Sequence, residues 1–327
     1  MTVVSKMRFA GMRVVVTGAS GFIGSQLVER LVAEGADVGA LARTRGQLAE
    51  IASADSFRFL CCDLTDAKAA RASIGRFAPE LLFHFASQPD SLESFEHTTD
   101  SLDVNVLGTL NALEALRLSG GKAIVYGDSC KVYGSQAQVP YRESTPTEPN
   151  SSYSISKLAG WQICKLYGRV HGIAAVTVRP TLIYGPRQSY NLITFVVNCL
   201  LRKDREISLD GGSQTRDPLF IADAVDAFIA AGERAPSLGG RVINLGGGQE
   251  TTVEDLAMLI VELSGSPATI ACRPRHARVT EMWRSYCDNA EAEAMLGWRP
   301  RTPLVVGLKQ TIEYLTARYG HGTGNTP

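Results

Sequence analysis

The residues with the clearest chemical meaning are a tyrosine and a lysine in the middle of the chain. Tyr153 and Lys157 are four residues apart, a spacing that places both side chains on one face of a helix. A free tyrosine has a pKa of about 10 and is a poor base near neutral pH, but a neighbouring ammonium group stabilises its phenolate. Tyr153 is therefore placed to accept a hydroxyl proton. Ser129, one predicted strand earlier, is placed to hold that hydroxyl by a hydrogen bond.

A glycine-rich segment near the start of the chain predicts a dinucleotide site. The run Thr17 to Gly24, TGASGFIG, follows an apolar strand and opens a helix. Gly18 permits a tight turn, Gly21 lets the backbone approach a pyrophosphate, and Gly24 lets the helix and strand pack closely. The free N–H groups at the helix N-terminus then face the phosphates. The residues expected to contact the cofactor here are Gly18, Ser20, Gly21, Phe22, Ile23 and Gly24.

The end of the second predicted strand bears on the choice between NAD and NADP. A carboxylate there binds the ribose 2′-hydroxyl, whereas an arginine accepts a 2′-phosphate. The chain has no carboxylate at this point and carries Arg43 and Arg45, so NADP is favoured over NAD, with Arg43 as a contact. The alternative is that both arginines are solvated loop charges. Asp63, followed by Leu64, is placed to accept the adenine amino group or, alternatively, to cap the next helix.

The first half of the chain alternates short apolar runs with longer helical patterns. This alternation predicts an α/β fold with a doubly wound parallel Rossmann sheet. The predicted strands are 13–17, 37–42, 57–62, 81–86, 122–127 and 174–180, and the predicted helices are 22–34, 99–118 and 151–171.

The second half is less regular and predicts a smaller C-terminal α/β substrate lobe. Its predicted helices are 219–231, 253–263, 290–296 and 304–318. The dinucleotide-binding domain is expected to comprise residues 1–180 with about 217–245, and the substrate lobe 181–216 with 246–320, followed by a tail at 321–327. This lobe is expected to cover the C-terminal edge of the sheet, where open α/β sheets bind ligands.

Composition narrows the class of partner. Lys and Arg number 33, as do Asp and Glu, so the formal net charge is zero, and neither a nucleic acid nor a membrane is expected as partner. No segment has the pattern of a secretion signal or of a membrane span. Seven cysteines without paired spacing fit the reduced thiols of a cytoplasmic protein. No metal-ligand spacing is found, and His84 is predicted to be a core histidine.

These segments resemble the extended short-chain dehydrogenases/reductases, specifically the NAD(P)-dependent nucleotide-sugar epimerases and dehydratases. The resemblance covers roughly residues 11–318. The segments that carry it are TGASGFIG (17–24), CDLTD (62–66), FHFASQP (83–89), DVNVLGTLNALEA (103–115), SCKVYG (129–134), YSISK (153–157), RPTLIYGP (179–186), GGSQTRD (211–217) and MLGWRP (295–300).

The resemblance implies a set of roles for individual residues. Ser129 and Tyr153 would be catalytic, and Ser129 would also contact the sugar. The cofactor would be bound by the three glycines with Asp63, Leu64, Phe85, Ala86, Tyr153 and Lys157, and the nucleotide-diphosphate sugar by Gln88, Arg216 and Arg278. Relatives pair the helices around 100–117 and 151–170 across a dimer interface, so a homodimer is expected.

The reaction depends on the two residues after Ser129. The family first oxidises the sugar C4 hydroxyl to a ketone, and its dehydratases usually place Asp-Glu or Asp-Lys at the two positions where this chain has Cys130 and Lys131. Our first hypothesis is a dehydratase in which the Cys130 thiol protonates the departing C6 hydroxyl and Lys131 removes the C5 proton. Alternatively, Cys130 is a packed apolar residue and Lys131 pairs with a phosphate or carboxylate.

Other reactions remain open on the same residues. A 4-epimerase or a 4-keto reductase would use the same Ser129, Tyr153 and Lys157. A more remote alternative is a non-catalytic dinucleotide sensor, against which these three intact residues argue.

Overall fold

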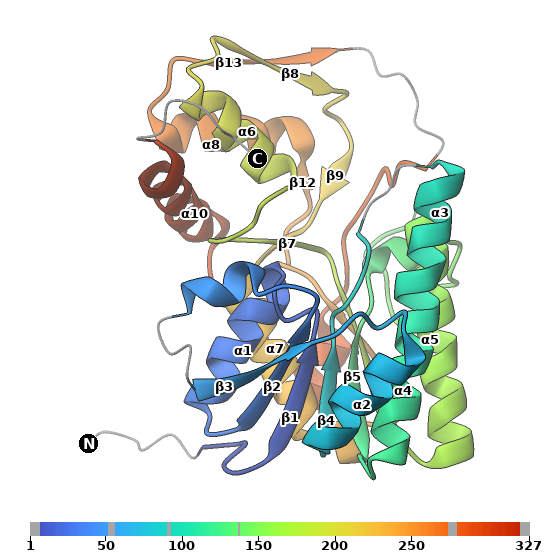
Figure 1. Ribbon diagram of the computed structural model, residues 1–327. Coiled ribbons are helices and arrows are strands. Elements are labelled where there is room, and N and C mark those ends of the chain that lie inside the picture. Colours follow the sequence, from blue (N-terminus) through green and yellow to red (C-terminus); the bar gives the residue numbers. More distant parts are fainter. Residues whose placement is uncertain (1–6, 52–55, 90–92, 137, 274–279, 321–327) are drawn as a thin grey trace.

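The structure is a computed structural model that describes residues 7–51, 56–89, 93–136, 138–273 and 280–320. Figure 1 shows a layered α/β body with a smaller lobe above one end of its sheet.

A seven-stranded parallel sheet forms the centre of the body. Its strands follow the order β11-β6-β5-β4-β1-β2-β3, so chain order reverses between β1 and β4. This confirms the doubly wound Rossmann sheet, and β11 adds a strand that the sequence patterns did not predict. The strands are β1 (Arg13–Thr17), β2 (Asp37–Ala42), β3 (Phe57–Cys61), β4 (Leu81–His84), β5 (Ala123–Gly127), β6 (Ala174–Pro180) and β11 (Val242–Leu245).

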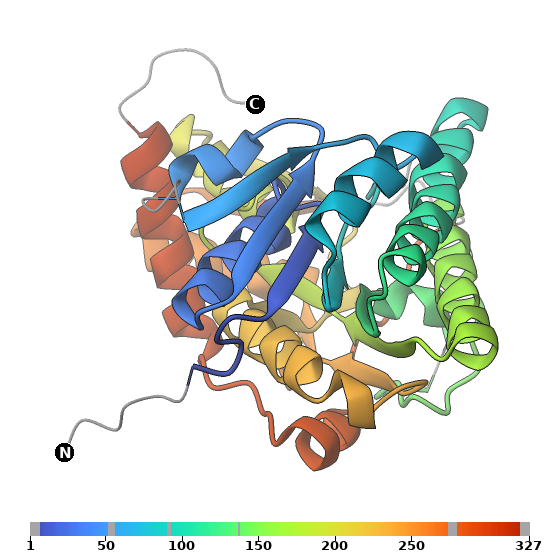
Figure 2. The same cartoon turned by 60° about the horizontal axis from the view of Figure 1, so that its bottom comes forward.

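Helices cover both faces of this sheet. On β1, Val14 and Val16 point into one apolar cluster and Val15 into another, because successive side chains of a strand alternate between faces. The first cluster includes residues of α1 (Phe22–Ala33) and α7 (Ile221–Glu233). The second includes residues of α2 (Ala67–Phe77), α4 (Gly108–Leu118) and α5 (Ser152–His171). The three layers are visible from a second side in Figure 2.

The helix predicted over 99–118 is longer and less uniform than expected. It starts as α3 (Phe95–Leu102), which Ser94 caps by accepting a hydrogen bond from the His97 N–H. It then widens into a π-helical turn, η3 (Asp103–Leu107), before continuing as α4. Turns of this kind often occur at functional sites.

The C-terminal lobe is built from helices and short strand pairs. The prediction of a helix from Leu219 was wrong at its start, because Leu219 and Phe220 pair in parallel with a strand that the sequence patterns missed. The lobe and its connections contain β7 (Leu182–Tyr184), α6 (Leu192–Leu201), β8 (Glu206–Asp210), β9 (Thr215–Arg216), β10 (Pro218–Phe220), β12 (Thr251–Thr252), α8 (Val253–Ser264), β13 (Thr269–Arg273), α9 (Ala290–Leu296) and α10 (Leu304–Tyr319). Three short 3-10 helices complete the described elements: η1 (Gly46–Glu50), η4 (Cys130–Tyr133) and η5 (Ala235–Ser237).

The strands of a parallel sheet all end at the same edge. The residues directly after β1, β4 and β5 are Gly18, Phe85 and Asp128, so they meet at this C-terminal edge. The lobe with α6, α8 and α10 lies above the same edge in Figure 1. Residues expected to bind the cofactor and residues expected to do chemistry therefore come together there.

Candidate active site

The glycine-rich turn between β1 and α1 has the geometry that its spacing predicts. Gly18 has a φ of +65°, and a Cβ there would lie 2.6 Å from the Ala86 nitrogen. A Cβ on Gly24 would lie 2.2 Å from the Gly18 oxygen, so Gly24 allows the close packing of helix on turn. Gly21 is the exposed N-cap of α1, and among the described residues no side chain caps that helix. The free N–H groups of the first turn fit the pyrophosphate of a dinucleotide.

Two charged residues stand at the ends of β2 and β3. Arg43 is exposed after β2, and its charge contributes to lowering the pKa of Asp63. The larger cause is a local hydrogen bond, in which the Thr65 N–H donates to Asp63 Oδ1 at 2.9 Å. Asp66, not Asp63, caps helix α2, so the alternative role suggested for Asp63 as a helix cap is wrong. Arg45 lies over the ring of Phe59, with 5.0 Å to the ring centroid.

Three expected cofactor contacts follow β3 and β4 at the same edge of the sheet: Leu64, Phe85 and Ala86. The Phe85 ring packs against Phe228 of α7, with centroids 4.6 Å apart, and Leu64 is a core residue. The Ala86 N–H donates to Thr17 Oγ1 at 3.3 Å.

Asn105, in the π-helical turn, is a site residue that sequence analysis missed. The Gln88 N–H donates to Asn105 Oδ1 at 2.7 Å, and Asn105 Nδ2 donates to the Gln88 oxygen and to Ser156 Oγ. Asn105 is 1% exposed. It therefore ties Gln88 to α5 beside Tyr153. Its signal in the sequence was a polar residue at a position that a regular helix would bury.

Tyr153 and Lys157 lie on α5, which begins with a capping box between Ser151 and Ser154. Burial raises the pKa of Tyr153, and the negative charge of Asp128 raises it further, whereas the hydroxyls of Ser129 and Ser87 act in the opposite direction. Burial lowers the pKa of Lys157 to about 8, again opposed by Asp128. The charge of Asp128 thus acts on both the half-buried Tyr153 and the buried Lys157, and Ser129 acts on the Tyr153 hydroxyl.

Cys130 occupies a different environment from Lys131. Its thiol is buried in a cluster with Tyr133, Tyr141, Met282 and Cys287, and its sulfur lies 3.4 Å from Ser285 Oγ. A hydrogen bond from the Cys287 thiol is the main cause that lowers the pKa of Cys130.

Lys131 is directed towards the reactive pair, with its Nζ 5.5 Å from the centroid of the Tyr153 ring. It is largely solvent-accessible, yet the surrounding protein atoms lower the pKa of its ammonium. Cys130, Glu281 and Glu93 act to raise this pKa, whereas the charge of Arg216 lowers it. Arg216 donates to Glu281 Oε1 at 2.6 Å and to the Met282 oxygen at 3.0 Å. The structure therefore brings Lys131, Arg216 and Tyr153 into one region of mixed charge, while Arg278 lies outside the described residues.

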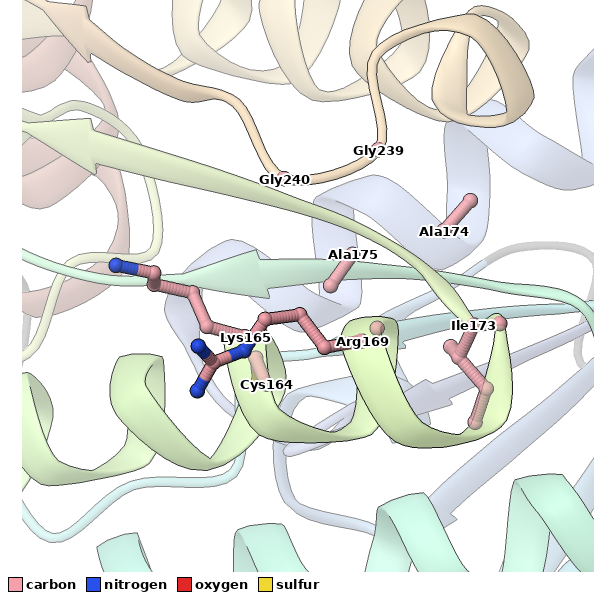
Figure 3. A pocket seen from close by; sticks show the side chains of 10 residues that line it. Cys164, Lys165, Arg169, Ile173, Ala174, Ala175, Gly239 and Gly240 are labelled. Atoms are coloured by element: carbon pink, nitrogen blue, oxygen red, sulfur yellow. The ribbon is translucent and has the colours of Figure 1, made fainter.

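A cavity of about 340 Å³ lies between the end of α5 and the start of β6 (Figure 3). It is bounded by the end of α5, the start of β6 and Gly239-Gly240, at the N-terminal edge of the sheet. Since the glycine turn and Ser129 lie at the opposite edge, this cavity is separate from the candidate site.

No group of three or more His, Cys, Asp or Glu side chains among the described residues could hold a metal ion. Within the same part of the chain, no helix is long and apolar enough to cross a membrane.

A glycine turn that opens onto an uncapped helix, with Tyr153 and Lys157 on a helix at the same sheet edge, defines a Rossmann-type dinucleotide-dependent enzyme. The chain belongs to the NAD dependent epimerase/dehydratase family, whose profile matches residues 14–246. The family resemblance found in the sequence is thereby confirmed.

Relatives within the family differ in reaction. A UDP-glucose 4-epimerase of Mycolicibacterium smegmatis is 35% identical over 93% of this chain and 98% of its own length. A dTDP-glucose 4,6-dehydratase of Streptomyces griseus is 29% identical over 91% of this chain and 92% of its own. The structure of UDP-glucuronic acid 4-epimerase from Bacillus cereus, in complex with UDP-glucuronic acid and NAD, superposes with a TM-score of 0.85 at 25% identity, covering 94% of this chain and 100% of that one.

Proposed function

We propose that this enzyme is an NAD(P)-dependent nucleotide-sugar 4-epimerase that acts through a 4-keto sugar. The observation that carries this proposal is the position of Tyr153 and Lys157 on one helix beside Ser129, combined with the burial of the Cys130 thiol against Ser285. Our first hypothesis was dehydration, which needs an acid for the departing C6 hydroxyl. The Cys130 thiol is buried against Cys287 and Ser285, so it is poorly placed to serve as that acid. The similarity to a UDP-glucose 4-epimerase, at 35% identity, also favours epimerisation over dehydration.

Three side chains would take part in the proposed epimerisation. Ser129 would hold the C4 oxygen by a hydrogen bond while Tyr153 accepts the C4 hydroxyl proton and Lys157 stabilises the phenolate. A dinucleotide bound at the glycine turn would supply a hydride acceptor for C4. The hydride would return to C4 after the keto sugar has rotated in the site and presents its opposite face. Tyr153 would then give the proton back to the oxygen on the opposite face.

Dehydration remains the second candidate, and Lys131 is the observation that favours it. Its ammonium lies near the Tyr153 ring and its pKa is lowered by desolvation, which moves it towards the range of a base. In the epimerase, the same cation would instead meet a phosphate or carboxylate of the substrate.

The cofactor and the substrate occupy different parts of the chain in this proposal. Residues 1–180 with about 217–245 would bind NADP in preference to NAD, through Arg43. Residues 181–216 and 246–320 would bind the nucleotide-diphosphate sugar, with Arg216 on the phosphates. Arg216 would exchange its present ion pair with Glu281 for these phosphates.

A screen of UDP-, dTDP-, GDP- and CDP-hexoses without added cofactor separates the reactions. An epimerase yields a product of unchanged mass and altered chromatographic retention, whereas a dehydratase product lacks the mass of one water. A 4-keto reductase instead consumes added reduced cofactor stoichiometrically. Loss of water from the accepted sugar would overturn the epimerase assignment.

The Tyr153→Phe variant tests whether the pair does the chemistry. Removing the hydroxyl removes the general base, so turnover is expected to fall by about 10²–10⁴-fold with the fold retained. Tyr319→Phe, which removes a hydroxyl from α10, is the matched control and should turn over normally. Unchanged turnover of an accepted sugar by Tyr153→Phe would refute the catalytic assignment.

A further inference from the structure

Asp128 follows β5 directly and precedes Ser129, yet the sequence patterns assigned it no role. Its side chain is fully buried, and its Oδ2 accepts a hydrogen bond from Arg179 Nε at 2.6 Å. Arg179 is held in turn: its guanidinium lies over the rings of Trp161 and Tyr133, at 4.5 and 5.2 Å, and donates to the Tyr133 hydroxyl at 3.2 Å. The second carboxylate oxygen, Oδ1, has no hydrogen-bond partner among the described residues.

Asp128 shares a sheet face with the Lys157 ammonium. The ladder of β5 and β6 continues through Asp128, whose N–H donates to the Val178 oxygen at 2.8 Å. Asp128 therefore projects to the same face as Tyr126, two residues earlier. Lys157 Nζ lies 4.5 Å from the centroid of the Tyr126 ring, and the Tyr126 hydroxyl donates to the Lys157 oxygen at 3.0 Å. The carboxylate is thus directed to the environment of Lys157.

We propose that Asp128 is a positioning residue of the reaction, whose buried negative charge, fixed by Arg179, keeps the protons on Lys157 and Tyr153 until the cofactor is bound. The inference rests on the proposed function, because it assigns Asp128 a task in the chemistry of that pair. Asp128 touches neither substrate nor cofactor in this role and acts only through its charge.

The direction of the effect follows from electrostatics. A fixed negative charge favours the protonated form of every group near it, so removing the charge lowers the pKa of both Lys157 and Tyr153. Burial already lowers the pKa of Lys157 to about 8 against the opposing charge of Asp128, so loss of the carboxylate would lower this pKa further. A larger share of Lys157 would then be neutral at physiological pH, which weakens its stabilisation of the phenolate.

Several other groups surround Tyr153 and Lys157. Among the described residues, none of these groups is a carboxylate. They are His84 on β4, Tyr126 on β5, Arg179 on β6, Cys164 on α5, Tyr133, Cys130 and Lys131 on η4, and Asn105 on η3.

The test titrates Lys157 directly in the enzyme without substrate. Protein labelled with ¹³Cε-lysine is followed by NMR from pH 6 to 11, and the Lys157 signal is assigned by its absence in Lys157→Arg. In Asp128→Asn, which keeps the shape and removes the charge, the Lys157 midpoint is expected to fall by about one pH unit or more. The basic limb of the pH–turnover profile should move in the same direction. An unchanged Lys157 midpoint would overturn the proposal.

Two further variants separate charge from folding. Asp128→Asn leaves Arg179 unpaired in the interior and can lose stability for that reason. The double variant Asp128→Asn/Arg179→Gln removes both charges and should recover the melting temperature but not the Lys157 midpoint. Asp223→Asn removes another buried carboxylate, one that accepts hydrogen bonds from the N–H groups of residues 301 and 302, and should leave the midpoint unchanged.

The outcomes also distinguish the two proposals. A lowered midpoint in both Asp128 variants and not in Asp223→Asn supports the role of Asp128, even if no nucleotide sugar is turned over, in which case only the proposed reaction fails. If the Lys157 midpoint instead falls and recovers together with the melting temperature across the variants, Asp128 is a purely structural residue.

Discussion

At the residue scale, the proposed preference for NADP rests on Arg43. It stands exposed after β2, where a carboxylate would select the ribose 2′-hydroxyl of NAD. Its charge already reaches Asp63 at the end of β3. An arginine at this position has the donors needed for a 2′-phosphate.

Arg43→Ala should therefore change cofactor preference more than cofactor affinity in general. We expect NADP binding to weaken about 10-fold or more, because a charge-assisted contact is worth roughly 1.5–3 kcal/mol, while NAD binding changes little. Calorimetric titration with both cofactors measures this. Arg58→Ala, an exposed arginine of β3 paired with Asp37, is the control. Equal weakening for NAD and NADP would show that Arg43 does not read the 2′-position.

At the scale of elements, His84 joins three segments that form the site. The Thr17 hydroxyl of β1 is 2.8 Å from His84 Nδ1, and His84 Nε2 is 2.9 Å from the Thr109 hydroxyl of α4. Thr109 donates to the Asn105 oxygen at 2.6 Å, so the chain of hydrogen bonds extends into the π-helical turn. The predicted core histidine is confirmed as fully buried, and burial lowers its pKa to about 3.

This buried neutral histidine predicts a pH dependence of stability. His84 titrates near 6.5 when unfolded and near 3 when folded, so below pH 6.5 the unfolded state binds the extra proton. Stability from this group is present above pH 6.5 and is lost as the pH falls towards 3, with a slope of about 1.4 kcal/mol per pH unit.

The His84→Gln variant, which cannot titrate, isolates this slope. Denaturant unfolding at pH 7, 6 and 5 should show the variant less stable at pH 7, with the difference from the natural protein shrinking at lower pH. A difference that stays constant with pH for His84→Gln would contradict the lowered pKa.

At the scale of the whole molecule, α3, α4 and α5 form an outer edge of the body (Figure 1). Large apolar side chains are exposed there: Phe95, Leu102, Leu107, Leu110, Leu118, Ile155, Leu166 and Val170. Exposed apolar patches of this kind mark protein interfaces. We propose that two copies of the chain pair through α4 and α5, which makes the enzyme a homodimer.

Leu166→Glu should break that dimer. The side chain is 47% exposed in the single chain, so a charge there costs little in the monomer but would be buried in the interface. Light scattering coupled to gel filtration should give the monomer mass for this variant. Met258→Glu, at 53% exposure on α8, should leave the dimer intact. A dimeric Leu166→Glu variant would place the interface elsewhere.

The strands and the glycine turn were predictable because they follow from local pattern. Apolar runs of strand length alternate with helical patterns in residues 13–180, and the observed bounds of most elements agree within one or two residues. The glycine spacing likewise predicted a tight turn at position 18 and close packing at position 24. The structure shows a positive φ at Gly18, and at Gly24 it leaves no room for a Cβ. Short strands such as β7 and β12 escaped prediction because pairing with distant segments, rather than composition, makes them strands.

By itself, the sequence determined the dinucleotide fold, the family and the Tyr153–Lys157 pair, since each depends on residue types at fixed local spacings. Only the tertiary structure decided which residues surround that pair. Contacts with residues far along the chain define the surroundings of Asp128, Arg179 and Asn105. The same holds for Cys130, whose thiol lies against Ser285 and Cys287, two residues far along the chain. Burial and charge depend on distance in space, and folding alone brings these groups within reach of one another.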